Sequence, residues 1–294
     1  MRTYGCPYQG SKNVIAEDII GFLPSGKRLV DLFGGGGAIS HCAVLSDKWK
    51  SVLYNDYDNI TYRYFKNAYE GEYSKPKYLE PVTREMFTKM KTQEDPYCFA
   101  CSFGNNYISY IYGKNIEKDR LTGERFIVCA DNKEDMKQIV PKELWYMLDD
   151  MENITDITER RLALYKIVKQ TKKNFRGYER LKQLERLQRL QRLQRLERLE
   201  FSNISYTEYQ YKDGDIVYCD IPYENTRNYS SNKTKFNHEQ FYEWVLTRPY
   251  QVFFSSYEIS NNRFYKVWEK TRRSTFSATN NKLLKQECIY SNRI

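Results

Sequence analysis

The 294-residue chain carries a moderate positive charge, with 47 lysines and arginines against 38 aspartates and glutamates, for a formal net charge of +9. Its composition is 40% hydrophobic and 16% aromatic, without the run of about 18 apolar residues that predicts a transmembrane helix. These features exclude an ordinary membrane-spanning protein and favour a polyanionic partner such as nucleic acid. Because the first residues lack the apolar core of a signal peptide, we expect a cytoplasmic location and no membrane partner.

Seven cysteines are scattered along the chain, and this odd number indicates reduced thiols in a reducing compartment. Cys98 and Cys101 form a single CxxC pair, and the sequence has only two histidines, His41 and His238. A structural zinc site would need a second pair of ligands at a matching spacing. We therefore expect no metal, and we expect both thiols to pack within the apolar segment 97–103.

The N-terminal segment joins a glycine turn to the start of a helix. Ser11 is a candidate N-cap, and apolar residues at helical spacing continue to Phe22. Backbone N–H groups and the ammonium group of Lys12 would then lie together, which suits a carboxylate or a phosphate. A simple capped helix with an exposed lysine explains this segment equally well.

Strand character over 28–33 is followed by four glycines, 34–37, and by a helical run over 38–45. Glycine allows the backbone to approach a ligand closely, so this order predicts the first half of a βαβ nucleotide-binding unit. The next strand, 51–56, ends in Asp56, 19 residues beyond Gly37. A carboxylate at about this spacing meets the hydroxyl groups of a ribose. An adenosine-containing cofactor is therefore predicted.

The glycine turn lacks the fingerprint of a dinucleotide site. Positions 39 and 40 hold isoleucine and serine, so the pattern G-x-G-x-x-G cannot be written. This argues against a nicotinamide dehydrogenase. The pattern Phe33-x-Gly35-x-Gly37 suits a cofactor that ends in an amino acid in place of a diphosphate.

Between residues 114 and about 205 the composition becomes charged, and helices are predicted over 133–151 and 154–173. Leucine then recurs at every third position from 181 to 199. A three-residue step turns an α-helix by about 300°, so no single apolar face results and a coiled coil is disfavoured. The residue types favour a helix, and a long 3₁₀-helix is uncommon. The arginines could follow phosphates, but we expect a low-complexity spacer.

After residue 200 strand character returns at 204–206 and 215–219. A capped helix is predicted over 236–245, a buried strand over 251–257, and a closing hairpin from the segments 273–277 and 287–290. Strands and helices thus alternate on both sides of the charged insert. This pattern predicts one interrupted α/β sheet.

The strand 215–219 runs directly into Asp220, Pro222 and Tyr223. In an open α/β sheet the ligand crevice lies outside the carboxyl ends of the strands, where this trio places a carboxylate, a rigid turn and an aromatic ring. Such a group could accept hydrogen bonds from an amine and stack on a flat ring. As an isolated turn, Asp220 could equally cap a helix while Pro222 ends the strand.

In this order the motifs resemble those of the Dam-type (D12 class) DNA adenine N6-methyltransferases, and more closely of their phage and prophage members. Residues 8–12 are similar to the amino-terminal cofactor motif of the family, 31–37 to its F-x-G-x-G motif, 55–56 to its acidic ribose-binding motif and 220–223 to D-P-P-Y. Ile221 replaces the first proline of D-P-P-Y. The insert lies where the family carries its target-recognition lobe.

The resemblance implies a Rossmann-like S-adenosylmethionine-dependent methyltransferase sheet over 1–113 and 201–294, with an inserted, mainly helical target-recognition lobe over 114–200 that includes the repeat 181–200. The implied reaction is methyl transfer from S-adenosylmethionine to N6 of an adenine flipped out of double-stranded DNA. Aspartate rather than serine at position 220 favours adenine N6 over cytosine N4. A cognate restriction endonuclease is a candidate partner in a restriction-modification pair, and a monomer is expected. A catalytically inactive DNA-binding protein is the alternative.

The resemblance also implies roles for individual residues. Asp220 and a backbone carbonyl before or at Pro222 would accept the two N–H bonds of the amine, and Tyr223 would stack on the base. Asp56 would hold the ribose, Tyr8 would face the cofactor's adenine, and Lys12 would lie at the methionine end or at the target base. The complete implied cofactor set is Tyr8, Lys12, Asp31, Phe33, Gly35, Gly37, Asp56 and Asp220.

Overall fold

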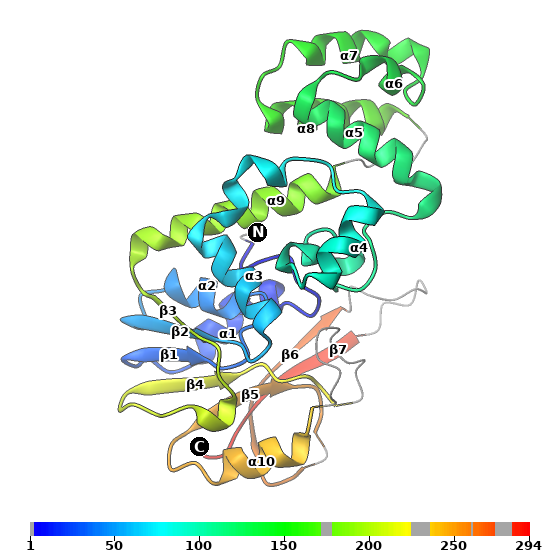
Figure 1. Cartoon of the computed structure of the whole chain (residues 1–294). Coiled ribbons are helices and arrows are strands. Elements are labelled where there is room, and N and C mark those ends of the chain that lie inside the picture. Colours follow the sequence, from blue (N-terminus) through cyan, green and yellow to red (C-terminus); the bar gives the residue numbers. More distant parts are fainter. Residues whose placement is uncertain (1–2, 172–177, 225–235, 260, 274–283) are drawn as a thin grey trace. The chain divides into compact units, whose positions relative to one another are not determined.

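The computed structural model describes residues 3–171, 178–224, 236–259, 261–273 and 284–294 (Figure 1). These residues form two compact units. The first, called here the sheet unit, falls within 1–6, 10–66 and 192–294; the second, the helical unit, falls within 7–9 and 67–191. The helical unit therefore begins well before residue 114, where the charged composition starts, and residues 67–113 group with it.

The sheet unit is built on one mixed sheet of seven strands. Their order across the sheet is β3-β2-β1-β4-β5-β7-β6, with β1 to β5 parallel and β7 antiparallel to both of its neighbours. The chain order reverses between β1 and β4, which is the switch point where a doubly wound sheet opens its ligand crevice. The strands are β1 Arg28–Asp31, β2 Ser51–Asn55, β3 Leu199–Ser202, β4 Asp215–Cys219, β5 Val252–Ser256, β6 Tyr265–Arg273 and β7 Leu284–Ser291.

The predicted α/β sheet is thus confirmed, and the predicted strand segment 287–290 lies in β7. Its partner β6 was not predicted, because it shares only Arg273 with the predicted arm 273–277, whose remaining residues lie outside the described ones. One strand was misplaced. Ser205 caps a 3₁₀ turn, Tyr206–Glu208, where strand character was expected. The edge strand β3 lies earlier, at Leu199–Ser202, and pairs parallel with β2.

Helices cover both faces of the sheet, with α1 and α2 on one face and α10 on the other (Figure 1). Ser11 does act as a cap, but it begins a 3₁₀ turn at Lys12–Val14 that precedes α1. On the α10 face, Phe241 and Val245 pack with Val217 and Phe254 in a core of the sheet unit, called here the main core. The helices are α1 Ala16–Phe22, α2 Ala38–Val44, α3 Asn59–Glu70, whose last residues belong to the helical unit, and α10 His238–Leu246.

The helical unit has its own core, formed by residues such as Phe126, Leu148 and Ile167. The helix predicted over 133–151 is interrupted around Pro141, because proline lacks the N–H that an unbroken helix needs. The α-helices are α4 Arg84–Thr92, α5 Glu117–Cys129, α6 Lys133–Lys137, α7 Trp145–Glu152, α8 Ile157–Gln170 and α9 Glu179–Leu190. Short 3₁₀ turns lie at Glu72–Ser74, Pro76–Tyr78, Pro96–Phe99, Phe103–Asn105, Lys114–Ile116 and Lys142–Leu144.

The leucine repeat is part of the core, so its interpretation as a spacer was wrong. It forms α9 and then a 3₁₀ segment, Gln191–Leu196, before Leu199 begins β3. Because successive leucines are about 60° apart, the four leucines in α9 cover about half of the helix circumference, and all four are buried. The buried leucines are Leu181, Leu184, Leu187, Leu190 and Leu193.

This packing predicts a large difference between two leucines of the repeat. Leu187 is 0% exposed, whereas Leu196 is 39% exposed. We expect Leu187→Ala to lower the free energy of unfolding by about 2 to 5 kcal/mol, and Leu196→Ala by less than about 1 kcal/mol. Urea denaturation of the two variants measures this. Equal effects would show that the repeat does not behave as core.

Cys98 and Cys101 are both buried free thiols, as predicted, and burial raises the pKa of Cys98 to about 12. Within the described ranges, no group of three or more histidine, cysteine, aspartate or glutamate side chains is arranged to hold a metal ion. None of the helices among the described residues is long and apolar enough to cross a membrane.

Candidate active site at the carboxyl edge of the sheet

Three acidic residues lie where adjacent parallel strands end. Asp31 is the last residue of β1, Asp56 directly follows β2, and Asp220 directly follows β4. Since β1 pairs with both β2 and β4 in parallel, the three carboxylates share one edge of the sheet. This edge flanks the switch point, where doubly wound sheets bind their ligands.

Asp56 is tied to the glycine turn that follows β1. Its Oδ2 accepts a hydrogen bond from the backbone N–H of Gly35 at 2.8 Å, and its Oδ1 accepts one from Asp58 at 2.9 Å. Tyr54 donates its hydroxyl to the carbonyl of Gly35 at 2.8 Å. Burial raises the pKa of Asp56 to about 7, against these backbone hydrogen bonds, which lower it. The acid and the turn, predicted separately, therefore form one structure.

Two glycines of the turn are required by the protein's own packing. Gly37 has φ of +72°, and a Cβ on it would lie 2.3 Å from the ring of Phe65. A Cβ on Gly34 would lie 2.2 Å from the ring of Tyr54. The segment before Pro7 also covers the turn, because Cys6 donates its N–H to the carbonyl of Gly36 at 2.6 Å. The sequence had suggested approach to a cofactor as the reason for these glycines, and side-chain packing is a second one.

Asp31 holds a buried carboxylate that is only half satisfied. The residue is 1% exposed, and its Oδ2 accepts a hydrogen bond from Ser40 at 2.7 Å. Its Oδ1 has no hydrogen-bond partner among the described residues. Burial raises the pKa of Asp31 to about 7, although the Ser40 hydroxyl lowers it. A buried acceptor without a donor is an unusual and costly feature, and it suits the amino group of a ligand.

Lys12 is buried against Asp220, which rules out the alternative of a simple capped helix with an exposed lysine. Lys12 is 5% exposed, and its Nζ lies 2.6 Å from Asp220 Oδ1. Ser255 donates its hydroxyl to the same Oδ1 at 2.8 Å. Burial raises the pKa of Asp220, and the Lys12 ammonium opposes that shift. No described residue donates to Oδ2, which leaves this oxygen able to accept an N–H bond.

Tyr223 is 9% exposed and is held by a residue that sequence reasoning missed. Its hydroxyl donates to Glu287 Oε1, and the Lys12 Nζ lies 4.6 Å from its ring centroid. The ring of Tyr257 packs edge-on against it at 4.6 Å. Glu287 appeared in the sequence only as part of a hairpin strand. The one feature of the sequence that could have indicated its role is its position directly before the apolar strand residues 288–290.

In the turn 220–223, the backbone carbonyls of Ile221 and Pro222 differ in their hydrogen bonding. The Nε2–H of His238 donates to the carbonyl of Pro222 at 2.7 Å. The carbonyl of Ile221 has no hydrogen bond from any residue that the structure describes. The Ile221 side chain is 2% exposed and packs in the main core, so the departure from D-P-P-Y is accommodated by apolar contacts.

Two predicted cofactor residues make contacts elsewhere. The half-buried ring of Phe33 packs against Tyr206 and Phe241, at centroid distances of 5.6 and 5.8 Å. Tyr8 belongs to the helical unit, where its ring lies 5.2 Å from that of Phe99. Their roles toward a cofactor stay predictions.

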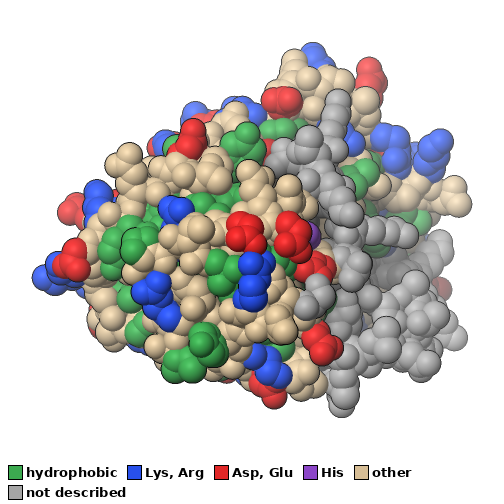
Figure 2. Space-filling view, turned by 90° about the horizontal axis from the view of Figure 1, so that it is seen from below, with side chains coloured by type: hydrophobic (Ala, Val, Ile, Leu, Met, Phe, Trp, Pro, Cys, Tyr) green, Lys and Arg blue, Asp and Glu red, His purple; other side chains and the backbone are tan. Residues whose placement is uncertain are grey.

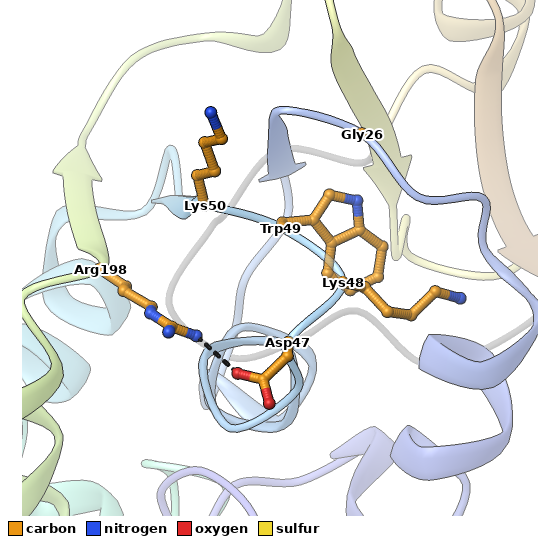
Figure 3. Close-up of a pocket in the computed structure, with 6 residues that line it drawn as sticks. All are labelled: Gly26, Asp47, Lys48, Trp49, Lys50 and Arg198. Atoms are coloured by element: carbon orange, nitrogen blue, oxygen red, sulfur yellow. Dashed lines mark hydrogen bonds and ion pairs between the residues drawn. The ribbon is translucent and has the colours of Figure 1, made fainter.

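A pocket of about 460 Å³ lies at the opposite, amino-terminal edge of the sheet (Figure 3). Arg198 pairs there with Asp47 at 3.1 Å, and Lys48 donates to the backbone carbonyl of Ile20 at 2.8 Å. Its lining contains none of the predicted site residues and consists of Gly26, Asp47, Lys48, Trp49, Lys50 and Arg198. On the face shown in Figure 2, acidic and basic side chains are interspersed.

A family model described as D12 class N6 adenine-specific DNA methyltransferase matches residues 8–245. The match covers well over half of the chain and includes all four motifs, together with the strand ends that carry Asp31, Asp56 and Asp220. No curated protein matches the chain in sequence. The mostly parallel sheet is that of a Rossmann-like methyltransferase. The chain therefore belongs to the D12 class N6 adenine-specific DNA methyltransferases, and it is a DNA adenine N6-methyltransferase.

Proposed function

We propose that this enzyme transfers the methyl group of S-adenosylmethionine to the amine of an adenine flipped out of double-stranded DNA, and that Asp220 Oδ2 and the carbonyl of Ile221 hold that amine. The observation that carries this proposal is the pair of open acceptors. Oδ2 and the Ile221 carbonyl have no donors among the described residues, while His238 occupies the carbonyl of Pro222. Of the two carbonyls considered from the sequence, the geometry favours that of Ile221.

Two acceptors address the weakness of the nucleophile. The lone pair of an exocyclic amine is conjugated with the ring, so the nitrogen attacks poorly. Hydrogen bonds from both N–H groups to Asp220 and Ile221 draw the nitrogen toward tetrahedral geometry and free the lone pair. Orientation of this kind can lower a barrier by about 7 to 11 kcal/mol.

Charge balance in this reaction requires a group that accepts one proton. Bound S-adenosylmethionine would supply a methyl group on a positively charged sulfur, and the leaving group would be a neutral thioether. The amine's lone pair forms the new N–C bond, so the nitrogen becomes positively charged and must lose a proton. Asp220 is placed to stabilise that charge, and its burial-raised pKa suits it to take the proton before releasing it to water.

Base flipping would bring the adenine amine out of the duplex and within reach of Asp220. Extruding an adenine costs a few kcal/mol, of which stacking on the Tyr223 ring could offset about 1 to 3 kcal/mol. The ammonium of Lys12 now lies 4.6 Å from that ring's centroid. We therefore propose that Lys12 shifts when a base arrives.

The residues at the ends of β1 and β2 fit the proposed cofactor. Asp31 Oδ1 is a buried acceptor with no donor among the described residues, as an amino acid's ammonium group requires. Asp56 is half-buried, and its carboxylate oxygens can accept ribose hydroxyls beside the backbone bonds they already have. These two acids would hold the methionine end and the ribose respectively.

This fit predicts opposite effects of Asp31→Asn on stability and on binding. Because the pKa of Asp31 is raised to about 7, its contribution to stability is full below about pH 4 and is lost as the pH rises through about 7. The ligand-free variant should therefore be more stable than the wild type at about pH 8, by about 1 to 3 kcal/mol. It should also bind S-adenosylmethionine about tenfold or more weakly. Urea denaturation across this pH range and calorimetric titration measure both effects; parallel pH curves for the two proteins would contradict the assignment.

We also propose that the insert 114–200, most of which lies in the helical unit, acts as the target-recognition lobe. Its separate core would allow surface side chains to vary without disturbing the sheet. We propose that the enzyme acts on double-stranded DNA as a monomer. A cognate restriction endonuclease is a candidate partner.

The test of the proposed function is transfer of radiolabel from the methyl group of S-adenosylmethionine to unmethylated duplex DNA. We expect incorporation that increases with time and requires the enzyme. A wild-type chain that binds duplex DNA without incorporating label would contradict the proposal and favour the catalytically inactive alternative.

A further inference from the structure

Glu287 is a fully buried carboxylate at the active site that none of the motifs contains. It lies on β7 and is 0% exposed. It also lies beyond residues 8–245, the part of the chain that matches the family model. Burying a carboxylate costs several kcal/mol unless it is paired, so its position calls for an explanation.

Glu287 contacts two of the residues that surround the amine acceptor. Its Oε1 lies 3.4 Å from Lys12 Nζ and accepts the hydroxyl hydrogen bond of Tyr223. The same ammonium lies 2.6 Å from Asp220 Oδ1. Two carboxylates from the C-terminal part of the chain thus share one ammonium group from its N-terminal part.

The charge of this cluster decides what it can stabilise. With Asp220 alone, Lys12 would neutralise the carboxylate that faces the substrate amine. With Glu287 ionised as well, the cluster of one ammonium and two carboxylates keeps a net charge of −1. In a site of low dielectric, that difference acts strongly on a positive charge developing a few ångströms away.

We infer that Glu287 is a positioning residue for methyl transfer, which holds Lys12 and the Tyr223 ring and keeps the amine site negative while the adenine nitrogen becomes positive. This inference rests on the proposed function, because it needs Asp220 as the amine acceptor. It also gives Lys12 a partner when the base arrives. The ammonium can move toward Glu287 without losing its ion pair.

A purely structural role makes a different prediction. If Glu287 only joined β7 to the N-terminal segment, its neutralisation would lower stability and leave the kcat of the folded enzyme nearly unchanged. The proposed role acts on the charged transition state, so its loss lowers kcat and leaves the KM values for DNA and cofactor nearly unchanged.

The experiment measures kcat and both KM values for Glu287→Gln on duplex DNA. We expect kcat to fall about 10- to 100-fold, with both KM values within about twofold of the wild type. The matched control is Glu269→Gln, on the neighbouring strand β6, where the carboxylate is 48% exposed and pairs with Lys266. This control should keep the wild-type kcat.

A second variant tests the charge argument and guards against misfolding. The double variant Lys12→Met, Glu287→Gln again leaves a net charge of −1, from Asp220 alone, and buries no unpaired ammonium. Its kcat at saturating substrates should exceed that of Glu287→Gln by about threefold or more. A kcat of the double variant at or below that of Glu287→Gln would overturn the inference.

Asp220→Ala, assayed in parallel, distinguishes a failure of the inference about Glu287 from a failure of the proposed function. If Asp220→Ala is inactive and Glu287→Gln retains the wild-type kcat, the inference about Glu287 fails and the proposed function stands. If Asp220→Ala remains active, or the wild type transfers no methyl group, the proposed function fails and the inference fails with it.

Discussion

Replacing Asp220 by alanine should reduce kcat for methyl transfer by about 10²- to 10⁴-fold while duplex binding changes by less than about threefold. The substitution removes the acceptor that aligns the amine and stabilises its positive charge. It leaves Lys12 with the carboxylate of Glu287, 3.4 Å away, so no unpaired ammonium is buried. We therefore expect the variant to fold and to bind DNA.

Single-turnover transfer and fluorescence anisotropy with duplex DNA measure the two effects. Asp220→Asn tests the charge separately, because asparagine keeps the shape and one acceptor oxygen. The control is Asp213→Ala, an acid just before β4 whose side chain is 94% exposed. An Asp220→Ala enzyme with wild-type kcat would show that the amine is held elsewhere.

Replacing Arg180 by alanine should lower the free energy of unfolding of the helical unit by about 3 to 5 kcal/mol. Arg180 and Glu124 form an ion pair at 2.8 Å in which both side chains are 0% exposed. The guanidinium also donates to the carbonyls of Tyr78 and Leu79, at 2.7 and 2.9 Å, and to the hydroxyl of Tyr97 at 2.9 Å. Its removal leaves a buried carboxylate and several acceptors without a donor.

Chemical denaturation followed by circular dichroism measures this loss. Arg189→Ala is the matched control on the same helix, α9, because its side chain is 67% exposed and pairs with Glu185 at 3.7 Å. It should cost less than about 0.5 kcal/mol. Similar losses for the two variants would mean that the buried pair contributes no more than a surface one.

The sheet and the positions of its acids could be predicted because both depend on local patterns. β-branched and aromatic runs marked β1, β2, β4 and β5, and an acid at the end of a parallel strand is brought to a common edge by the sheet itself. Asp31, Asp56 and Asp220 therefore needed no knowledge of long-range contacts.

The network around Asp220 could not be predicted in the same way. Lys12 and Glu287 are separated by nearly the whole chain, and their contact depends on the pairing of β5 with the antiparallel strand β7. A lysine beside a helix start is usually solvated, and only the fold shows that this one is buried. Likewise, the choice between the carbonyls of Ile221 and Pro222 depends on His238, a residue of the following helix.

The helical unit and the charged region of the sequence have different bounds. The charged region after residue 114 suggested a boundary there, whereas residues 67–113 belong to the same compact unit. The three-residue repeat predicted no single apolar face, but only four of its leucines lie in α9, where they cover about half of the helix circumference. The folded chain buries these leucines, and a single sequence does not show which residues pack against them.

Mass spectrometry of nucleosides tests the central claim most directly. Duplex DNA is incubated with the wild-type enzyme and S-adenosylmethionine that carries an isotopically labelled methyl group, and the DNA is then digested. We predict labelled N6-methyladenine with the wild type, formed at least about 10²-fold more slowly with Asp220→Ala. Label on cytosine N4, or labelled N6-methyladenine formed at equal rates with both proteins, would contradict this claim.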